Sequence, residues 1–329
     1  MAQRGHRLKA IEVLTACTAL WALSFPVMKA LALEQQRLLP VNGSWFFTSL
    51  GIFYRFGLAG LAMLLLYRRE LKTLTRRELE QGAWLACFGV SGILFQMDAL
   101  AYTAASTCAF LTQGYCVFIP LWVAVTQGRR PSLKVFLSVA LVVAGVAVLA
   151  HIHWGEFRLG RGELETLLAS LLFTGQILSL EHPRYAANRP GVFSTVMFLG
   201  MALGCLPLVL ATMPAPAACW QAYASVPAAG MLAILVVFCT LMAYTLMNRW
   251  QRQVTATEAG LIYCVEPVIT SIFALFLPGL FSWWAGIDYP NETMTVRLVF
   301  GGGLILGANL LLQSRWLDGQ NKPGWVADG

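Results

Sequence analysis

Two charged side chains lie near the middle of long apolar segments of this 329-residue sequence, namely Arg55 and Glu266. An ionised side chain in hydrocarbon is costly, so a charge that persists there usually faces a partner or a water-filled cavity. The two residues fall at equal depth in their segments, which permits them to pair. Two interpretations stay open. Either a buried ion pair holds the protein together, or one or both charges meet a charged or zwitterionic ligand, with Glu266 as the carrier of a coupling proton.

Eight further polar or aromatic residues also fall in mid-segment. They are Trp21, Ser24, Gln96, Gln113, Tyr115, Gln176, Tyr244 and Tyr263. An amide in hydrocarbon needs hydrogen-bond partners from neighbouring helices or from a ligand. Interhelical bonding is the simpler role for any single one, but a cavity of aromatic rings and amides suits a mostly apolar solute with a few polar groups. These eight residues and Glu266 form the candidate substrate-binding set, and Arg55 is interpreted as a structural or coupling charge.

Apolar helices are the elements that must position these side chains. The chain is 58% apolar and 12% charged, which excludes ordinary water-soluble globular domains. About 20 apolar residues cross the hydrocarbon layer of a bilayer. Hydropathy predicts ten crossings, at residues 10–33, 44–67, 79–101, 104–127, 132–150, 162–181, 190–211, 226–248, 254–278 and 294–315. We therefore expect an all-α integral membrane protein with ten transmembrane helices.

The lysines and arginines predict how these helices are oriented. With a cytoplasmic N-terminus, 17 of the 23 fall on the cytoplasmic side, namely Arg4, Arg7, Lys9, Arg68, Arg69, Lys72, Arg76, Arg77, Arg129, Arg130, Lys134, Arg184, Arg189, Arg249, Arg252, Arg315 and Lys322. The opposite side holds Arg37, Arg158 and Arg161. Because translocation of Lys and Arg is disfavoured, both termini are predicted to be cytoplasmic. The predicted location of the protein is the cell inner (plasma) membrane. The net charge of +7 then reflects topology, and no nucleic-acid partner is expected.

The orientation places an acidic and aromatic loop, residues 279–294, outside the cell. Its Trp283 and Trp284 are interpreted as anchors at the membrane interface. Asp98 falls at the outer end of its helix, where a solvated carboxylate is expected.

A search for internal repeats divides the chain into two halves. Sliding the sequence on itself by 150 positions places residues 104–128 over 254–278 without gaps, with five identities in 25 positions. The match joins the fourth predicted helix to the ninth, so that residues 1–150 and residues 151–329 each hold five helices. An odd number forces opposite topologies. Inverted halves of this kind serve alternating access, with a ligand near the midplane between them.

The fifth and tenth predicted helices are equivalent elements of the two halves. Small residues favour close helix packing in both, namely Gly301, Gly302, Gly303 and Gly307 in the tenth and Ala140, Ala144 and Gly145 in the fifth. Gly303 and Gly307 form a small-xxx-small face. Packing within one chain and self-association both remain open, so a monomer and a homodimer stay alternatives. Membrane lipid surrounds the protein in either case.

Metal and cofactor chemistry finds little support. None of the eight cysteines forms a C-x-x-C pair, and we interpret them as small buried hydrophobic residues. His151 and His153 lack a third well-placed ligand and are assigned no role. No catalytic residue, metal or cofactor is predicted, and the missing G-x-x-x-x-G-K-[ST] motif excludes nucleotide-driven pumping within this chain. The four histidines are scattered over both sides, which makes a lipid-modifying enzyme a poor alternative.

Five short motifs, in this order, resemble a known family. They are Leu20-Trp21-x-x-Ser24-Phe25, Arg55-Phe56, Ala99-Leu100-Ala101-Tyr102-Thr103-x-Ala105-Ser106, Val254-Thr255-Ala256-Thr257-Glu258-Ala259 and Glu266-Pro267. Over nearly its whole length the chain resembles the drug/metabolite transporter superfamily, in its EamA-like amino-acid and metabolite exporter branch. It departs from the family pattern in long outer loops near residues 34–44 and 279–294, and it lacks the acidic residue often found after the fourth and ninth helices.

The resemblance implies a central cavity surrounded by the first, third, fourth, sixth, eighth and ninth helices. It further implies a secondary transporter, not an enzyme, that exports amino acids, aromatic ones among them, or related metabolites and drugs. A nucleotide-sugar or other metabolite carrier of the same fold is the alternative. A channel or a lipid-modifying enzyme would be a different class of function.

Overall fold

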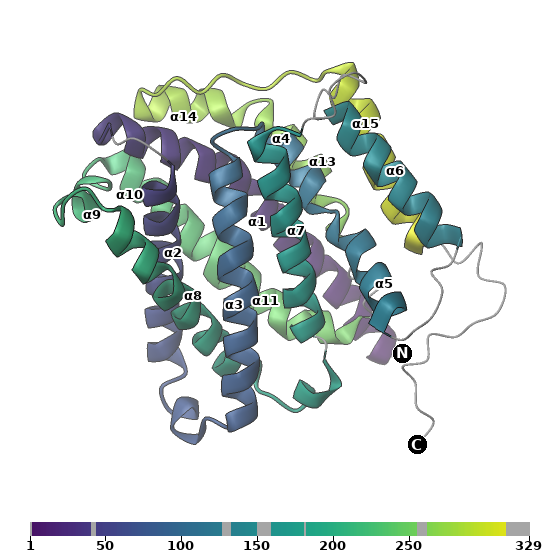
Figure 1. Cartoon of the computed structure of the whole chain (residues 1–329). Coiled ribbons are helices and arrows are strands. Elements are labelled where there is room, and N and C mark those ends of the chain that lie inside the picture. Colours follow the sequence, from purple (N-terminus) through teal and green to yellow (C-terminus); the bar gives the residue numbers. More distant parts are fainter. Residues whose placement is uncertain are drawn as a thin grey trace.

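The computed structural model describes residues 2–40, 44–126, 133–149, 159–180, 182–254 and 262–313. Over these ranges the chain is helical and has no β-strand, which confirms the all-α prediction (Figure 1). The helices are α1 (Ala2–Leu38), α2 (Trp45–Leu66), η1 (Glu70–Thr73), α3 (Arg76–Ala99), α4 (Ala105–Thr112), α5 (Tyr115–Thr126), α6 (Leu133–Leu149), α7 (Arg161–Leu180), η2 (Pro183–Tyr185), α8 (Pro190–Thr212), α9 (Ala218–Gln221), α10 (Val226–Val236), η3 (Val237–Met242), α11 (Ala243–Trp250), η4 (Gln251–Gln253), α13 (Glu266–Ala274), α14 (Leu277–Ala285) and α15 (Val296–Gln313).

Six helical segments of the described chain are long and apolar enough to cross a bilayer: α1, α2, α3, α7, α8 and the continuous run from α10 to α11. The protein is therefore a multi-pass membrane protein. The pair α13 and α14 adds a seventh segment if its 49° bend is part of one crossing. Shorter apolar helices cover Ala105–Ile119, Phe136–Leu149 and Val296–Leu311. Helix length thus supports six or seven crossings, and ten remains a prediction.

Two of the expected helices are interrupted. The segment expected at 104–127 is divided into α4 and α5 by a turn at Gln113 and Gly114, where glycine weakens the helix. In the segment expected at 254–278, residues 264 and 265 form a turn and α13 begins at Glu266, with Pro267 in its first turn. Proline fits the start of a helix because the first turn has no acceptor for its missing N–H. Residues 255–261 lie outside the described part.

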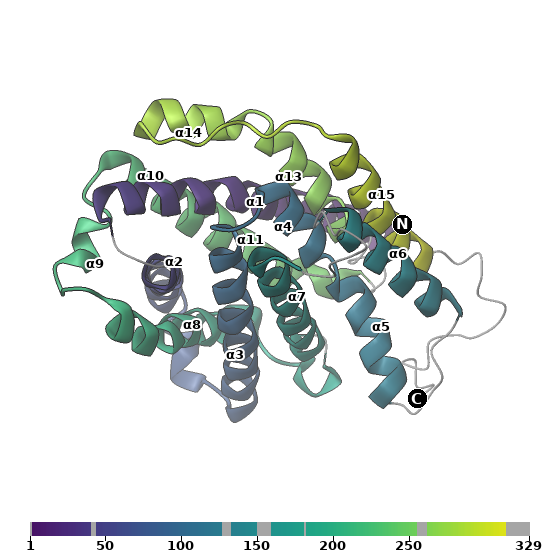
Figure 2. The same cartoon turned by 45° about the horizontal axis from the view of Figure 1, so that its top comes forward.

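The expected outer loop at 279–294 begins with a further helix, α14, rather than with irregular chain. Its Trp283 is exposed, whereas the ring of Trp284 lies against Gly230 of α10. Figure 2 shows α14 on one side of α1, with α2, α3, α7 and α8 on the other. The end of the molecule that carries α14, the C-terminal end of α3 and the start of α7 is named the α14 end (Figure 1). The opposite end, which carries η1 and η2, is named the arginine-rich end.

The helices pack in a regular pattern of pairs. α2 packs mainly against α8, α3 packs against α7 and α8, and α6 packs against α15. α1 runs through the centre and contacts α10, α11 and α13, while α4 contacts α7 and α13. Figure 1 shows the α6 and α15 pair at the edge of the bundle. The largest buried cluster lies where α1, α2, α3, α8 and α10 meet, with Phe56, Phe193 and Phe198 at its centre.

Close backbone approach holds α6 to α15. A Cβ atom at Gly145 would lie 2.8 Å from the carbonyl oxygen of Gly301, and one at Gly301 would lie 3.1 Å from that of Gly145. The stripe expected to mediate packing, Gly303 and Gly307, faces away, because a Cβ at either position meets no atom within 4 Å in the described chain. Of the small residues expected to mediate packing, Gly145 and Gly301 therefore do so within one chain, whereas the Gly303 and Gly307 face does not.

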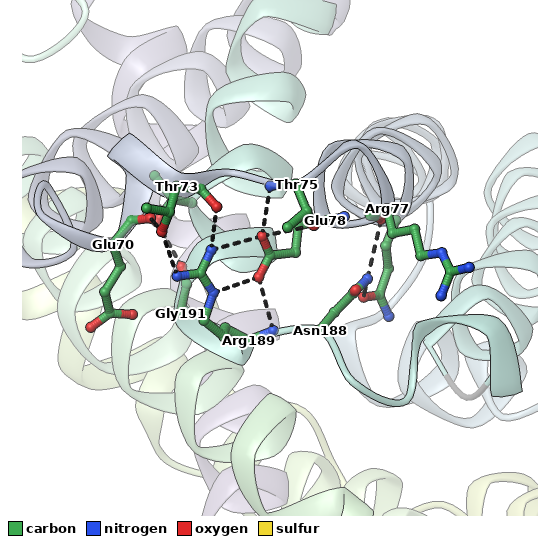
Figure 3. Close-up of polar contacts among 10 residues, drawn as sticks. Glu70, Thr73, Thr75, Arg77, Glu78, Asn188, Arg189 and Gly191 are labelled. Carbon is green, nitrogen blue, oxygen red and sulfur yellow. Dashed lines mark hydrogen bonds and ion pairs between the residues drawn. The ribbon is translucent and has the colours of Figure 1, made fainter.

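A dense set of hydrogen bonds joins α3 to the start of α8 at the arginine-rich end (Figure 3). The carboxylate of Glu78 accepts from the backbone N–H of Thr75 at 2.9 Å and from Nε of Arg189 at 2.7 Å. It also accepts from the backbone N–H of Arg189 at 3.2 Å. The same guanidinium donates to the carbonyl oxygen of Thr73 at 2.9 Å, and the amide of Asn188 donates to that of Arg77 at 3.1 Å. Glu78 thereby caps α3 and fixes the entry into α8.

The glycine contacts predict different tolerance to a larger side chain. Gly145→Leu should destabilise the folded protein by about 1–3 kcal/mol, because the added atoms overlap the α15 backbone. Gly303→Leu should leave stability nearly unchanged. Thermal unfolding in detergent measures both. Equal loss in the two variants would contradict the packing described here.

The polar cluster predicts a difference between two glutamates of α3. Glu78→Ala should lower the unfolding temperature roughly twice as much as Glu80→Ala, or more. The side chain of Glu78 is 2% exposed and its removal leaves the donors of Thr75 and Arg189 unpaired, whereas the side chain of Glu80 is 28% exposed. Thermal unfolding at low and high salt measures the difference. A loss in Glu78→Ala that high salt abolishes would argue against a buried contact.

Candidate functional site

A cavity lies between the helices of the bundle. Side chains from α1, α2, α3, α4, α5, α7, α8, α11, η4 and α13 line it, together with Tyr263 just before α13. The apolar lining residues are Phe25, Leu85, Ile93, Phe173, Ile177, Leu180, Met197 and Met247. Leu180 and Gln251 lie at the ends of α7 and η4, so the cavity extends from the centre toward the arginine-rich end.

The structure brings most of the candidate substrate-binding set together here. The residues of the set that line the cavity are Trp21, Ser24, Gln96, Tyr115, Gln176, Tyr244, Tyr263 and Glu266. Gln113 does not line it but donates from Nε2 to Oε2 of Glu266 at 3.1 Å. Arg55 also lines it. What any of these residues binds stays a prediction.

Arg55 is a buried cation with uncharged partners. Its side chain is 1% exposed, and Nε donates to Oγ1 of Thr240 at 2.6 Å. Nη2 donates to the carbonyl oxygen of Cys239 at 3.2 Å, and Nη1 lies 3.2 Å from the sulfur of Met28. A guanidinium has five N–H groups, so these contacts leave two without a described acceptor. Within the described residues no carboxylate pairs with Arg55, Glu266 included.

A local change of helix type supplies two of these acceptors. η3 is a π-helix between α10 and α11, and the hydroxyl of Thr240 donates to the carbonyl oxygen of Leu235, five residues back. In a π-turn the backbone hydrogen bonds are displaced by one residue, which lets the carbonyl of Cys239 turn toward Arg55. The helix thus changes from α to π geometry where Arg55 contacts it.

Glu266 stands at the other interruption of helical structure. It is the first residue of α13, and its side chain is buried against Gln113 in the turn between α4 and α5. The thiol of Cys116 contacts the amide oxygen of Gln113, with a sulfur to oxygen distance of 3.8 Å. Both interruptions therefore meet at the cavity wall, and polar side chains satisfy one another there.

Three aromatic rings form one wall of the cavity. The ring of Trp21 lies edge-on to both Tyr244 and Tyr263, with centroids 5.5 Å apart in each case. The Tyr263 hydroxyl donates to the amide oxygen of Gln251 at 2.9 Å. Among the residues that the structure describes, the buried indole N–H of Trp21 has no hydrogen-bond partner, and neither has the amide oxygen of Asn248. These two unpaired groups, a donor and an acceptor, remain for a ligand to satisfy.

The remaining glutamines of the set bond within the protein. Gln96 donates to Oγ1 of Thr112 at 3.1 Å, and Gln176 donates to the carbonyl oxygen of Leu85 at 3.3 Å. Sequence analysis missed Asn248 and Gln251 because they fall at the predicted end of the eighth helix, where polar residues are expected to be solvated. Their signal was the spacing of Tyr244, Asn248 and Gln251, which places all three on one face of a helix.

The described residues contain no group of three or more His, Cys, Asp or Glu side chains that could hold a metal ion. His151 and His153 lie outside the described part of the chain.

Comparison with known proteins adds information about the fold alone. The chain matches no protein-family model and no curated protein. Sixteen chains of solved structures match. One of them, described only as "Crystal structure of protein", aligns with a TM-score of 0.55 and 18% sequence identity, over 92% of this chain and 96% of that one. At such low identity the likeness shows a fold shared over nearly the full length and says nothing of function.

The contact between Gln113 and Glu266 predicts two different outcomes of substitution. Gln113→Leu removes the donor to a buried carboxyl group and should cost about 1–3 kcal/mol of stability. Glu266→Gln keeps an acceptor oxygen for the Gln113 amide and should cost less. Chemical denaturation of both variants measures the two losses. A loss in Glu266→Gln that equals or exceeds the loss in Gln113→Leu would contradict the contact.

Proposed function

We propose that this protein is a secondary carrier that exports small organic solutes across the plasma membrane by alternating access. Its substrates are amphipathic molecules with an anionic group, such as aromatic amino acids and related metabolites or drugs. The observation that carries the proposal is the central cavity, in which a buried guanidinium without a carboxylate partner and a wall of aromatic rings line the same space. The proposed frame is ten helices in two inverted halves, residues 1–150 and 151–329, with both termini in the cytoplasm.

The pairing of helices supports inverted halves. Helices one to five would be α1, α2, α3, the α4 and α5 pair, and α6. Helices six to ten would be α7, α8, the α10 to α11 run, α13 and α15. α1 then packs against α13 as α7 packs against α4, and α1 packs against α10 and α11 as α7 packs against α3. The pairs α2 with α8 and α6 with α15 join equivalent helices. A two-fold axis in the membrane plane produces such pairs.

The interruptions support the same relation. A turn at residues 113–114 divides α4 from α5, and a turn at residues 264–265 precedes α13. The two turns are 151 positions apart, which is one position from the shift of the sequence repeat. Carriers with inverted repeats commonly place broken helices at the binding site, where the freed backbone groups line a cavity.

The chemistry of the cavity supports the substrate class. The two spare N–H groups of Arg55 suit a carboxylate, since a guanidinium binds one with two parallel hydrogen bonds. The rings of Trp21, Tyr244 and Tyr263 suit an aromatic or aliphatic body. Glu266 can meet an ammonium group or carry a coupling proton. The same groups fit the resemblance to the drug/metabolite transporter superfamily.

Counterflow in liposomes tests the proposal. Purified protein in vesicles preloaded with mixed amino acids and nucleotide sugars should accumulate a labelled aromatic amino acid. The same compound without its carboxylate should compete at least tenfold less well, because it leaves Arg55 without an anion. Arg55→Gln should reduce counterflow by a comparable factor, with Lys72→Gln as the matched control for loss of one exposed charge.

Each result decides between functions. Exchange of the nucleotide sugar alone would assign the other substrate class. Equal competition by the decarboxylated compound would remove Arg55 from substrate binding even if Arg55→Gln fails to fold. Flux without counterflow would indicate a channel.

A further inference from the structure

A cluster of charges at the α14 end, outside the central cavity, joins α3 to α7. The guanidinium of Arg161 on α7 donates to Oδ2 of Asp98 on α3 and to Oε1 of Glu165 on its own helix, the latter at 2.7 Å. It also donates to the Tyr102 hydroxyl at 2.7 Å and lies over that ring. Asp98 has a side-chain exposure of 0%, so it is not the solvated carboxylate expected at a helix end. One cation thus binds two carboxyl groups.

The second oxygen of each carboxyl group is buried, and among the residues that the structure describes neither Oδ1 of Asp98 nor Oε2 of Glu165 has a hydrogen-bond partner. The two carboxyl groups lie close together because they bind the same guanidinium. Two buried acceptors that share no donor repel each other and forfeit solvation, which is costly. A single proton between them would satisfy both.

The surrounding charged groups are engaged elsewhere. Glu163 on α7 accepts from the hydroxyl of Thr103 at 3.1 Å, and Lys29 on α1 donates to the carbonyl oxygen of Thr103 at 2.7 Å. Glu292, in the segment after α14, accepts from the backbone N–H of Ala105 at 2.9 Å and so caps α4. The thiol of Cys108 on α4 accepts from the hydroxyl of Thr166, which follows Glu165 on α7. None of these groups donates to Asp98 or Glu165.

We propose that Glu165 binds one solvent proton at Oε2 and donates it in a hydrogen bond to Oδ1 of Asp98. Uptake of that proton changes the charge of the set Asp98, Glu165 and Arg161 from −1 to zero. No other bond is made or broken, and the proton comes from water and returns to it. Release of the proton leaves two negatively charged carboxylates facing each other between α3 and α7. This contact is next to the cavity, because Asp98 lies two residues after Gln96, which lines it. The site does not depend on what the cavity transports.

Glu165→Gln provides the sharpest test, because the new amide supplies an N–H in place of the shared proton. Infrared spectra of the purified protein, recorded across pH, should show the carbonyl stretch of a protonated carboxyl group. The difference spectrum between the wild type and Glu165→Gln should contain one such group per chain. Glu163→Gln, on the same helix, is the matched control and should leave the band unchanged.

Stability against pH gives a second measurement. A proton that the folded protein holds and the unfolded chain has already released stabilises the folded state more as pH falls. The unfolding temperature of the wild type should therefore fall as pH rises across the range in which Glu165 releases its proton, by several degrees more than that of Glu165→Gln. Asp98→Asn repeats both measurements if Glu165→Gln does not fold.

Equal infrared bands in the wild type and both variants would overturn the proposal, as would parallel pH profiles of the wild type and Glu165→Gln. Because neither readout involves transport, failure of the carrier proposal leaves these outcomes unaffected. Loss of the band together with intact counterflow would mean that the proton is bound without being transported, and would still support the site.

Discussion

A positive charge buried in an apolar bundle is the constraint on which the centre of this protein depends. Arg55 cannot be solvated by water at 1% exposure, so its N–H groups need acceptors from the protein. An ordinary α-helix offers few, because its carbonyl groups are used by the residues four positions on. The chain meets the need with a threonine hydroxyl and with a π-helix that redirects one carbonyl group. The wall of the cavity is shaped by that solution.

Interrupted helices also leave polar groups that need hydrogen-bond partners, here from the backbone itself. Where α4 ends and where α13 begins, backbone groups lose their partners, and in an apolar environment they must find others. Gln113 and Glu266 occupy these two positions and bond to each other across the halves of the chain. Polar side chains are therefore concentrated at the breaks. The cavity thereby gains polar groups in a lining that is otherwise largely apolar.

Much of the cavity was predictable from the sequence because depth in a membrane is encoded by distance along an apolar helix. Trp21, Tyr244 and Tyr263 each fall in the middle of an apolar segment, and side chains at one depth on neighbouring helices meet. Which face of a helix packs against its neighbour is harder to predict than the depth of a residue in the membrane. Gly303 and Gly307 have the spacing of a packing face, but α15 turns a different face to α6 because Gly145 and Gly301 permit closer contact.

Features that need a partner far away in the sequence were not predictable. Nothing local marks η3 as a π-helix, since its geometry depends on Arg55, which lies 185 positions before Thr240. Asp98 resembles a carboxylate at a solvated helix end until Arg161 of α7 is placed beside it. α14 was taken as loop because nine residues are too few for a membrane crossing, although they suffice for a helix that lies along one.

The π-helix has a consequence for how this protein can change in evolution. Each residue of a helix advances the chain by about 100° around its axis, so the extra residue held in η3 turns all later side chains by that angle. Tyr244 and Asn248 come after it, and both line the cavity. Deleting one residue from η3 would rotate them onto a different face and would remove the acceptor for the guanidinium. In descendants of this sequence, we expect the arginine and the additional residue to be kept or lost together.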